Sequence, residues 1–524
     1  MGMDPFVVVG GDAAGLSAAS KLTREAPERD VVVFEKGRWV SYAHCGTPYF
    51  VKGAVDGLTD LLTLTPDEIE ERGIDLRRER EVTAVDTDAR TVTVESADGE
   101  SFEQPYGDLL VATGAHAVTA PVDGTGLAGV FTMHGLDDAA AVRAALEPAG
   151  EATPESLGGD GYVDRERVAR YADWEPPETV AVVGGGYVGV EMAEAFSAHD
   201  LDVHLFQRGE HVLVPFGGAV AERVETELRD RGVTLHLNET VERFASEDRV
   251  PDDRDPDAGA GDGNGGAAND ADDHGAANDA DDHGAANDDD HGDAGERVAR
   301  LECASGAALD VDLGLVGVGI RPNVNLVADA PVELGESGAI AVDEYGRTSV
   351  DDVYAAGDCA EDYHTVTGEP AWVPLGLTAN RAGRAVGQSV AGDLTETGTT
   401  AGTAVVKAFD QECGRTGITD HGEARAAGFD PASETVTAPS RSSYYPGAAE
   451  TVVTLVADRA SGRLLGETIV GPDRAAVRID TVATALDAGM TVGDVENLDL
   501  AYAPPFSPVW DPVLTAAKVL NGRL

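Results

Sequence analysis

Four cysteines are the side chains with the most distinctive chemistry in this sequence: Cys45, Cys303, Cys359 and Cys413. They are far apart and form no CxxC pair, so neither a disulfide framework nor a metal site of the zinc type is predicted. Cys45 lies in the segment 41–50, SYAHCGTPYF, downstream of one glycine-rich turn and far upstream of a second. A thiolate there can exchange electrons with a bound redox cofactor. Because no second cysteine is near, a small-molecule thiol must supply the second sulfur.

The first glycine-rich turn has the setting of a dinucleotide site. An apolar run from Pro5 to Val9 leads into GGDAAG at 10–15, and an alanine-rich helical pattern follows. Glycines let the backbone approach a pyrophosphate that rests on the helix N-terminus. Asp12 replaces the usual middle glycine, so the motif is imperfect. The next predicted strand, Val31 to Phe34, ends in Glu35, where an acid can accept hydrogen bonds from a ribose.

The second glycine-rich turn is complete. A strand pattern from Thr179 to Val183 precedes GGGYVG at 184–189, which has the full GxGxxG spacing. Two such units imply two dinucleotides, one flavin and one nicotinamide. The following strand ends in Gln207 and Arg208, where an NADH-selective site carries an acid. Arg208 can pair with the 2′-phosphate of NADPH, which is therefore favoured. The alternative is a solvent-facing Arg208 that leaves NADH usable.

The chain has a formal net charge of -57 over 524 residues. This charge repels nucleic acids and anionic membrane surfaces, so neither is an expected partner. Abundant acids with scarce lysine resemble proteins of salt-loving archaea, which suggests a halophilic source. No export signal and no apolar run long enough to cross a membrane is recognised, so a cytoplasmic location is expected. The length suggests two or three domains.

The segment SYAHCGTPYF and the two glycine turns resemble the single-cysteine branch of the pyridine nucleotide-disulfide oxidoreductases. Within it, the coenzyme A-disulfide reductases and their NADH oxidase and polysulfide reductase relatives are most similar, over nearly the whole chain. The resemblance implies an α/β fold with two Rossmann-like nucleotide-binding domains and a C-terminal α+β dimerisation domain. The expected boundaries are 1–118 and 313–398 for the FAD-binding domain, 119–312 for the NAD(P)-binding domain and 399–524 for the dimerisation domain of a homodimer.

The resemblance also assigns site residues. Cys45 is the expected redox-active thiol. Tyr445 and Tyr502 are candidates to reach into the partner's cysteine site, with Tyr444 as the alternative to Tyr445 and interface packing as the competing interpretation. His44 is either a donor that lowers the pKa of Cys45 or a structural residue. The candidate cofactor-binding residues, for FAD and NADPH (or NADH), are Gly10, Gly11, Ala13, Ala14, Gly15, Glu35, Lys36, Ala112, Thr113, Gly114, Gly184, Gly186, Gly189, Glu191, Arg208, Gly319, Gly357 and Asp358.

Two segments depart from this pattern. Residues 151–177 are rich in Pro, Gly and acids and are interpreted as a surface insertion. Residues 251–296 repeat the unit GAANDADDH and have the composition of a disordered, strongly solvated loop. The flanks 233–244 and 297–303 read as strands, so this loop is expected to extend a hairpin.

The expected reaction is the NAD(P)H-dependent reduction of coenzyme A disulfide, or a related small disulfide, through Cys45. An NAD(P)H oxidase that cycles through a sulfenic acid is one alternative, although those enzymes usually carry a histidine in the first glycine loop. Polysulfide reduction is another. A flavoprotein redox sensor without catalytic activity is the alternative from a different class.

Overall fold

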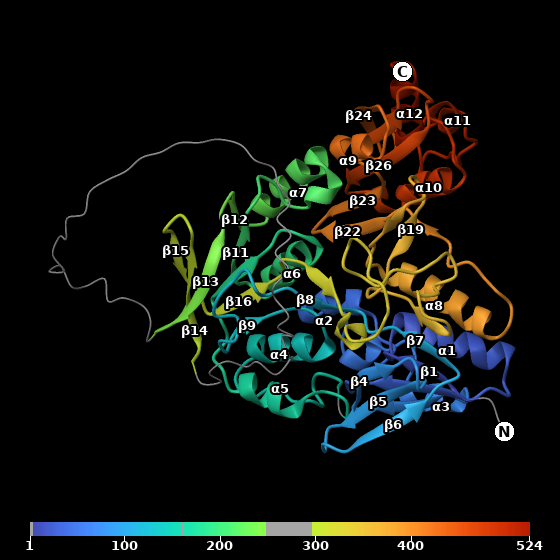
Figure 1. The fold of residues 1–524 in the computed structure, drawn as a ribbon. Helices are drawn as coiled ribbons and strands as arrows, with labels where there is room; N and C mark the ends of the chain where they lie inside the picture. Colours follow the sequence, from blue (N-terminus) through green and yellow to red (C-terminus); the bar gives the residue numbers. More distant parts are fainter. Residues whose placement is uncertain (1–3, 160, 248–295) are drawn as a thin grey trace, which may run out of the picture.

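The computed structural model describes residues 4–159, 161–247 and 296–524. These residues build two units with parallel sheets and a C-terminal unit with an antiparallel sheet (Figure 1). The repetitive acidic segment predicted at 251–296 falls outside the described residues except for its last position. No helix of the described residues has the length and apolar character needed to span a membrane.

The first unit has a five-stranded parallel sheet in the order β18-β7-β1-β2-β3. Its apolar strands are almost fully buried, as expected for a parallel sheet covered on both faces. The strands are β1 (Phe6–Val9), β2 (Val31–Glu35), β3 (Asp75–Arg78), β7 (Asp108–Val111) and β18 (Val353–Ala355). The helices are α1 (Ala13–Glu25), α2 (Thr47–Lys52), α3 (Pro66–Glu71) and α8 (Gly376–Val390). The chain therefore returns to its first sheet after an excursion of more than two hundred residues.

Helices α1 and α8 pack on each other at backbone distance. A Cβ placed on Gly383 would lie 2.0 Å from the carbonyl oxygen of Ala14, and one on Gly387 would lie 2.3 Å from that of Ala18. Only glycine allows this approach. A three-stranded antiparallel sheet follows β3, formed by β4 (Arg80–Asp86), β5 (Thr91–Ser96) and β6 (Ser101–Pro105).

The second unit repeats the parallel arrangement in the order β12-β11-β10-β16-β9. The strands are β9 (Val130–Phe131), β10 (Thr179–Val183), β11 (Asp202–Gln207), β12 (Thr234–Leu237) and β16 (Leu313–Val316). The helices are α4 (Leu136–Leu146), α5 (Arg165–Ala172), α6 (Tyr187–Ser197) and α7 (Gly218–Asp230). Two short strands that pair antiparallel, β8 (Ala115–Ala117) and β17 (Ile320–Pro322), connect this unit with the first.

Residues 151–177 do not form the simple surface insertion that their composition suggests. They contain α5, whose Val168 and Tyr171 are buried in the core of the second unit. Tyr171 packs against Phe131 and Trp174 with ring centroids 4.9 Å apart in both pairs. The prediction of a surface insertion was wrong here, because the polar residues of α5 lie on one face of a short amphipathic helix whose other face is buried.

The predicted flank 233–244 is two strands: β12 joins the parallel sheet, and only the second strand pairs with the flank downstream of the acidic segment. β13 (Val241–Ser246) pairs antiparallel with β14 (Val298–Cys303), which pairs with β15 (Ala308–Asp310).

The C-terminal unit has an antiparallel sheet in the order β22-β23-β26-β25-β24. Its strands are β22 (Ala404–Ala408), β23 (Gln411–Gly417), β24 (Pro431–Pro439), β25 (Glu450–Asp458) and β26 (Leu464–Gly471). The helices are α9 (His421–Ala426), α10 (Ala475–Asp487), α11 (Val492–Glu496) and α12 (Pro512–Asn521). The small strands β19 (Asp362–His364), β20 (Pro370–Ala371) and β21 (Thr399–Thr400) lie between this unit and the first (Figure 1). Two Rossmann-like units and an α+β unit confirm the predicted fold class.

Candidate active site

The first glycine turn joins β1 to α1 without room for side chains. Gly10 has φ +112°, and a Cβ there would lie 2.1 Å from the carbonyl oxygen of Ala112. A Cβ on Gly15 would lie 1.9 Å from the carbonyl oxygen of Gly10. Ala13 and Ala14 form the first helical residues. The bare backbone at the start of α1 fits a dinucleotide pyrophosphate.

Glu35 ends β2 beside this turn. Its carboxylate accepts the backbone N–H groups of Gly11 and Gly37, each at 2.8 Å. Burial raises the pKa of Glu35, and the two N–H bonds and the charge of Lys36 oppose that rise. The acid predicted for a ribose therefore stands where predicted, fixed in direction by backbone donors.

The second glycine turn repeats this geometry between β10 and α6. Gly184 has φ +108°, and its Cβ would lie 2.2 Å from the carbonyl oxygen of Gly317. A Cβ on Gly189 would lie 1.8 Å from the carbonyl oxygen of Gly184. A Cβ on Gly186 would meet no atom within 4 Å. Gly186 thus faces open space, as a glycine that contacts a pyrophosphate must.

Gln207 occupies the position in the second unit that Glu35 has in the first. Its Oε1 atom accepts the N–H of Gly185 at 3.0 Å, as Glu35 accepts that of Gly11. Arg208 is exposed, and no ion pair or hydrogen bond joins its side chain to another residue in the described ranges. A neutral amide and an available guanidinium stand where an NADH-selective site has a carboxylate.

Cys45 lies in a single turn of 3-10 helix, His44–Gly46, directly before α2. Its side chain is exposed, in contrast to the other three cysteines. Desolvation first, and the charge of Glu191 second, raise the pKa of the Cys45 thiol. The protein groups alone therefore disfavour a thiolate, and its formation needs a further partner such as a bound cofactor.

Glu191 of α6 and Tyr49 of α2 connect the second glycine turn to the cysteine segment. The Tyr49 hydroxyl donates to Glu191 Oε1 at 2.8 Å. Burial raises the pKa of Glu191 to about 7, against the opposing effect of the Tyr49 bond. A carboxyl group that exchanges a proton near neutral pH thus lies close to Cys45.

Both ring nitrogens of His44 have partners other than Cys45. Its Nε2 atom pairs with the Asp12 carboxylate, and its Nδ1 atom lies 3.1 Å from the carbonyl oxygen of His134. Burial lowers the pKa of His44, but the bond to Asp12 and its charge outweigh this and give a net rise. Asp12 has an ordinary φ of -122° and also accepts the N–H of Tyr42 at 3.2 Å. Asp12 can therefore replace the middle glycine of the first motif, because its backbone needs no glycine and its carboxylate binds His44 and Tyr42.

Several other predicted cofactor residues, among them Thr113, Gly114 and Gly319, lie at or beside the crossing between the two units. Gly114, Gly319 and Gly357 have positive φ values of +69°, +126° and +83°. Thr113 and Asn323 exchange two hydrogen bonds, at 2.7 and 2.8 Å, between the outward and return crossings.

Asp358 follows β18 in the same region. Burial raises its pKa, the nearby charge of His44 opposes this, and Asp12 adds to it. Asp358, His44 and Asp12 therefore lie near one site. Cys45 belongs to the same site, because the charge of Asp358 also raises the pKa of its thiol. Cys359 next to it is fully buried, and its Sγ atom lies 3.5 Å from the carbonyl oxygen of Val111 and 3.6 Å from that of Ala356, as in a packed residue.

The tyrosine segments lie together on the C-terminal unit. The Tyr502 hydroxyl lies beside that of Tyr444, which raises the pKa of Tyr502. The structure thus pairs Tyr502 with Tyr444, the alternative to Tyr445. Arg478 of α10 holds both segments, because its guanidinium donates to the carbonyl oxygens of Ser440 at 2.6 Å and Phe506 at 3.4 Å. The exposed aromatic and apolar side chains of this surface are Tyr444, Tyr445, Tyr502, Phe506, Val509 and Trp510.

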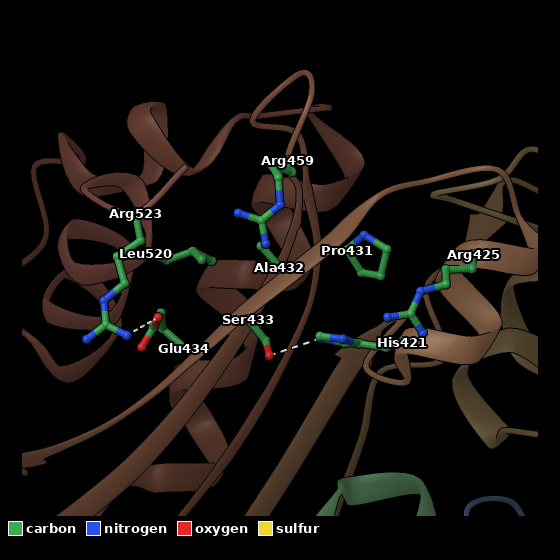
Figure 2. Close-up of a pocket in the computed structure, with 9 residues that line it drawn as sticks. All are labelled: His421, Arg425, Pro431, Ala432, Ser433, Glu434, Arg459, Leu520 and Arg523. Atoms are coloured by element: carbon green, nitrogen blue, oxygen red, sulfur yellow. Dashed lines mark hydrogen bonds and ion pairs between the residues drawn. The ribbon is translucent and has the colours of Figure 1, made fainter.

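A surface cavity of about 490 Å³ lies elsewhere, on the C-terminal unit between α9, β24 and the end of α12 (Figure 2). Its three arginines are exposed, and two of them pair with acids, Arg523 with Glu434 and Arg459 with Asp430. None of the predicted site residues lines it.

Several site contacts escaped sequence reasoning: Tyr49 with Glu191, Lys52 and Lys407 with Glu194, and His44 with Asp12. The sequence does contain a signal for the contacts of Tyr49 and Lys52. Tyr49 and Lys52 are three residues apart after Pro48, so they share a face of a helix that begins beside Cys45. The contact of Lys407 joins residues 213 positions apart, which no local pattern reveals.

Comparison with known proteins agrees with this geometry. The chain is 37% identical over 518 residues to an NAD(P)H coenzyme A polysulfide/persulfide reductase of Pyrococcus horikoshii, covering 98% of both chains. It is 26% identical over 508 residues to a coenzyme A disulfide reductase of Staphylococcus aureus, covering 96% of this chain and 97% of the relative. The structure of an NAD-dependent persulfide reductase from A. fulgidus superposes with a TM-score of 0.81 at 31% identity, over 99% of this chain and 83% of that chain.

Two family models cover most of the chain. The model described as pyridine nucleotide-disulphide oxidoreductase matches residues 4–262 and 283–379, and the dimerisation domain of the same family matches residues 403–512. The two glycine turns and Glu35 fit the FAD and NAD(P)H that these enzymes use. The chain belongs to the pyridine nucleotide-disulphide oxidoreductase family and is an NAD(P)H-dependent flavoprotein oxidoreductase.

Proposed function

We propose that the protein uses NADPH to reduce a sulfur–sulfur bond of a coenzyme A compound, a disulfide or a persulfide, with Cys45 as its only redox-active cysteine. The observation that carries the proposal is the place of Cys45, at the start of the helix that Tyr49 joins to Glu191 of the second glycine turn. The relatives named for coenzyme A disulfide and for coenzyme A polysulfide or persulfide reduction support this substrate class.

Bound FAD supplies a carrier that accepts a hydride from NADPH and passes on two electrons. The Cys45 thiolate attacks one sulfur of R–S–S–R′, forms a Cys45–S–S–R bond and releases R′–S⁻. Two electrons break this new bond and regenerate the thiolate, while R–S⁻ leaves. The two thiolate products take up two protons. One is what remains of the transferred hydride after its two electrons have gone to the disulfide, and the other comes from solution. Glu191, with a pKa of about 7, is a local group that can hold one of them.

The homodimer belongs to this proposal. The match of residues 403–512 to the family's dimerisation domain supports it. So does the exposed surface of Tyr444, Tyr502 and their apolar neighbours, which a second copy can cover. In this arrangement Tyr502 and Tyr444 act at the partner's Cys45. The preference for NADPH rests on Gln207 and the available Arg208.

Acceptor assays test the function. Initial rates with coenzyme A disulfide, coenzyme A persulfide, polysulfide, oxygen and peroxide are compared under one salt condition. The two coenzyme A substrates should give the highest kcat/KM, and Cys45→Ser should abolish these rates together with the long-wavelength thiolate-to-flavin absorption formed with NADPH. Cys303→Ser, a buried cysteine distant in sequence, is the matched control. An unchanged spectrum and rate in Cys45→Ser would refute the single-cysteine mechanism.

NAD(P)H oxidation by oxygen is the second candidate. His44 places an imidazole against the first glycine turn through Asp12, although the turn itself has no histidine. A relative from Methanocaldococcus jannaschii named NADH oxidase is 28% identical over 514 residues. Oxygen ranking above both coenzyme A substrates in the acceptor assay would favour this function.

A further inference from the structure

The carboxylate of Glu194 lies where the three units of the chain meet. Glu194 is on α6 of the second unit, and its side chain is only 6% exposed. Its Oε1 atom accepts Lys52 Nζ of α2, in the first unit, at 2.5 Å and Lys407 Nζ of β22, in the C-terminal unit, at 2.9 Å. Its Oε2 atom accepts the backbone N–H of Phe409 at 2.6 Å. We call these groups the Glu194 cluster.

The composition of the chain makes this convergence informative. The sequence has five lysines, at positions 21, 36, 52, 407 and 518, and two of them meet on one buried carboxylate. A buried carboxylate is costly unless it is paired and hydrogen-bonded. Here both lysines and a backbone donor satisfy it, and the pKa of Glu194 is lowered because these bonds outweigh its desolvation.

The cluster acts on the helix that follows Cys45. Lys52 and Tyr49 are three residues apart on α2, and they bond to Glu194 and Glu191, which are three residues apart on α6. Two parallel bonds thus fix the orientation of α2 against α6. Because Cys45 is two residues before α2, the same bonds fix the thiol relative to the second glycine turn.

The cluster also acts on the ionisation of Glu191. The charge of Glu194 raises the pKa of Glu191, and the charge of Lys407 lowers it. Lys407 is thus the one side chain of the C-terminal unit that both bonds to the cluster and influences Glu191. The position of the C-terminal unit therefore affects the charge close to Cys45.

We propose that Glu194 is a positioning residue through which Lys407 of the C-terminal unit holds the Cys45 helix in its reactive place. This deepens the proposed function and rests on Cys45 being the redox-active thiol. Glu194 and Lys407 touch no reacting atom in this scheme. They act through Lys52, α2 and Glu191.

The test compares Lys407→Met, Lys407→Arg and Glu194→Gln in the full-length holoenzyme. Glu302→Gln, which removes the Arg243–Glu302 ion pair of the β13–β15 sheet, is the matched control. Lys407→Met and Glu194→Gln should lower kcat for coenzyme A disulfide at least tenfold and leave KM for NADPH within twofold. Lys407→Arg keeps the charge and should restore kcat to within threefold of wild type. The control should equal wild type.

A second measurement does not depend on the acceptor. Alkylation of Cys45 by iodoacetamide is followed at a pH above the thiol's pKa, where the rate reports access to the sulfur rather than its ionisation. Release of α2 should make alkylation at least threefold faster in Lys407→Met and Glu194→Gln. The double variant Lys407→Met/Glu194→Gln should be alkylated at nearly the same rate as Glu194→Gln alone, because the two residues act as one unit.

The outcomes separate the two proposals. If wild type reduces none of the coenzyme A substrates, the proposed function fails, and the alkylation rates alone decide the inference about Glu194. Alkylation rates equal to wild type in both variants would overturn it. Faster alkylation with unchanged kcat would also overturn it, because the cluster would then be only structural.

Discussion

The choice between NADPH and NADH should depend on Arg208 and Gln207 at the second nucleotide site. Arg208→Ala removes an exposed guanidinium that has no described partner, so it should not affect folding. A charged hydrogen bond contributes ~1.5–3 kcal/mol, and exposure reduces this to ~1–2 kcal/mol. Since 1.4 kcal/mol is tenfold, KM for NADPH should rise about 5- to 30-fold. KM for NADH should not change.

Gln207→Glu extends the same test. The new carboxylate is isosteric with the amide, can still accept the N–H of Gly185, and reproduces the arrangement of Glu35 with Gly11. It should bind a free ribose 2′-hydroxyl and repel a 2′-phosphate by ~1 kcal/mol near solvent. Combined with Arg208→Ala, the ratio of kcat/KM for NADPH to that for NADH should fall on the order of a hundredfold.

Steady-state kinetics with both nucleotides at one salt concentration measures this ratio. Arg170→Ala, an exposed arginine on α5 of the same unit, is the control and should leave the ratio unchanged. If Arg208→Ala weakens NADPH and NADH equally, or changes neither by more than twofold, Arg208 does not read the 2′-phosphate.

Three further outcomes are expected. Because burial raises the pKa of Glu191 from 4.5 to about 7, its favourable contribution to folding is complete below pH 4.5 and is lost as pH rises through 7. Glu191→Gln should therefore gain up to about 3 kcal/mol over wild type between pH 5 and pH 8 in denaturant unfolding, and a pH-independent difference would contradict this. Gly186→Ala should fold and keep its yellow colour but bind NADPH at least about tenfold more weakly, whereas Gly15→Ala, with its Cβ 1.9 Å from a carbonyl oxygen, should lose bound flavin; equal flavin content in the two variants would disagree with the geometry. Tyr502→Phe and Tyr444→Phe should each lower kcat for coenzyme A disulfide by ~10²-fold if their hydroxyls serve the partner's Cys45, and unchanged kcat would assign both to packing.

The sequence predicted best what local spacing encodes. The strand predicted at Thr179–Val183 has these bounds in the structure, and both glycine turns lie between a strand and a helix as expected. The spacing of the glycines is enough to predict that the backbone is closely packed at these turns. Buried parallel strands are also easy to recognise, because both faces require apolar residues.

The parts that could not be predicted depend on tertiary contacts. Helix α5 was missed because its eight residues carry only a few apolar side chains, and its burial against α4 is a property of the whole unit. The role of Asp12 depends on His44, which is 32 positions away in the sequence and reaches it only in the folded chain. Likewise, nothing near Glu194 in the sequence indicates that lysines from two other units reach it.

The close packing of α1 and α8 has a consequence for biosynthesis. Strand β18 and helix α8 complete the first sheet and cover α1, yet they lie beyond residue 350. While the ribosome is still making the middle of the chain, the small-residue face of α1 has no counterpart. The amino-terminal Rossmann unit is therefore the first to be synthesised, but it cannot be completed until the chain beyond residue 390 has been made.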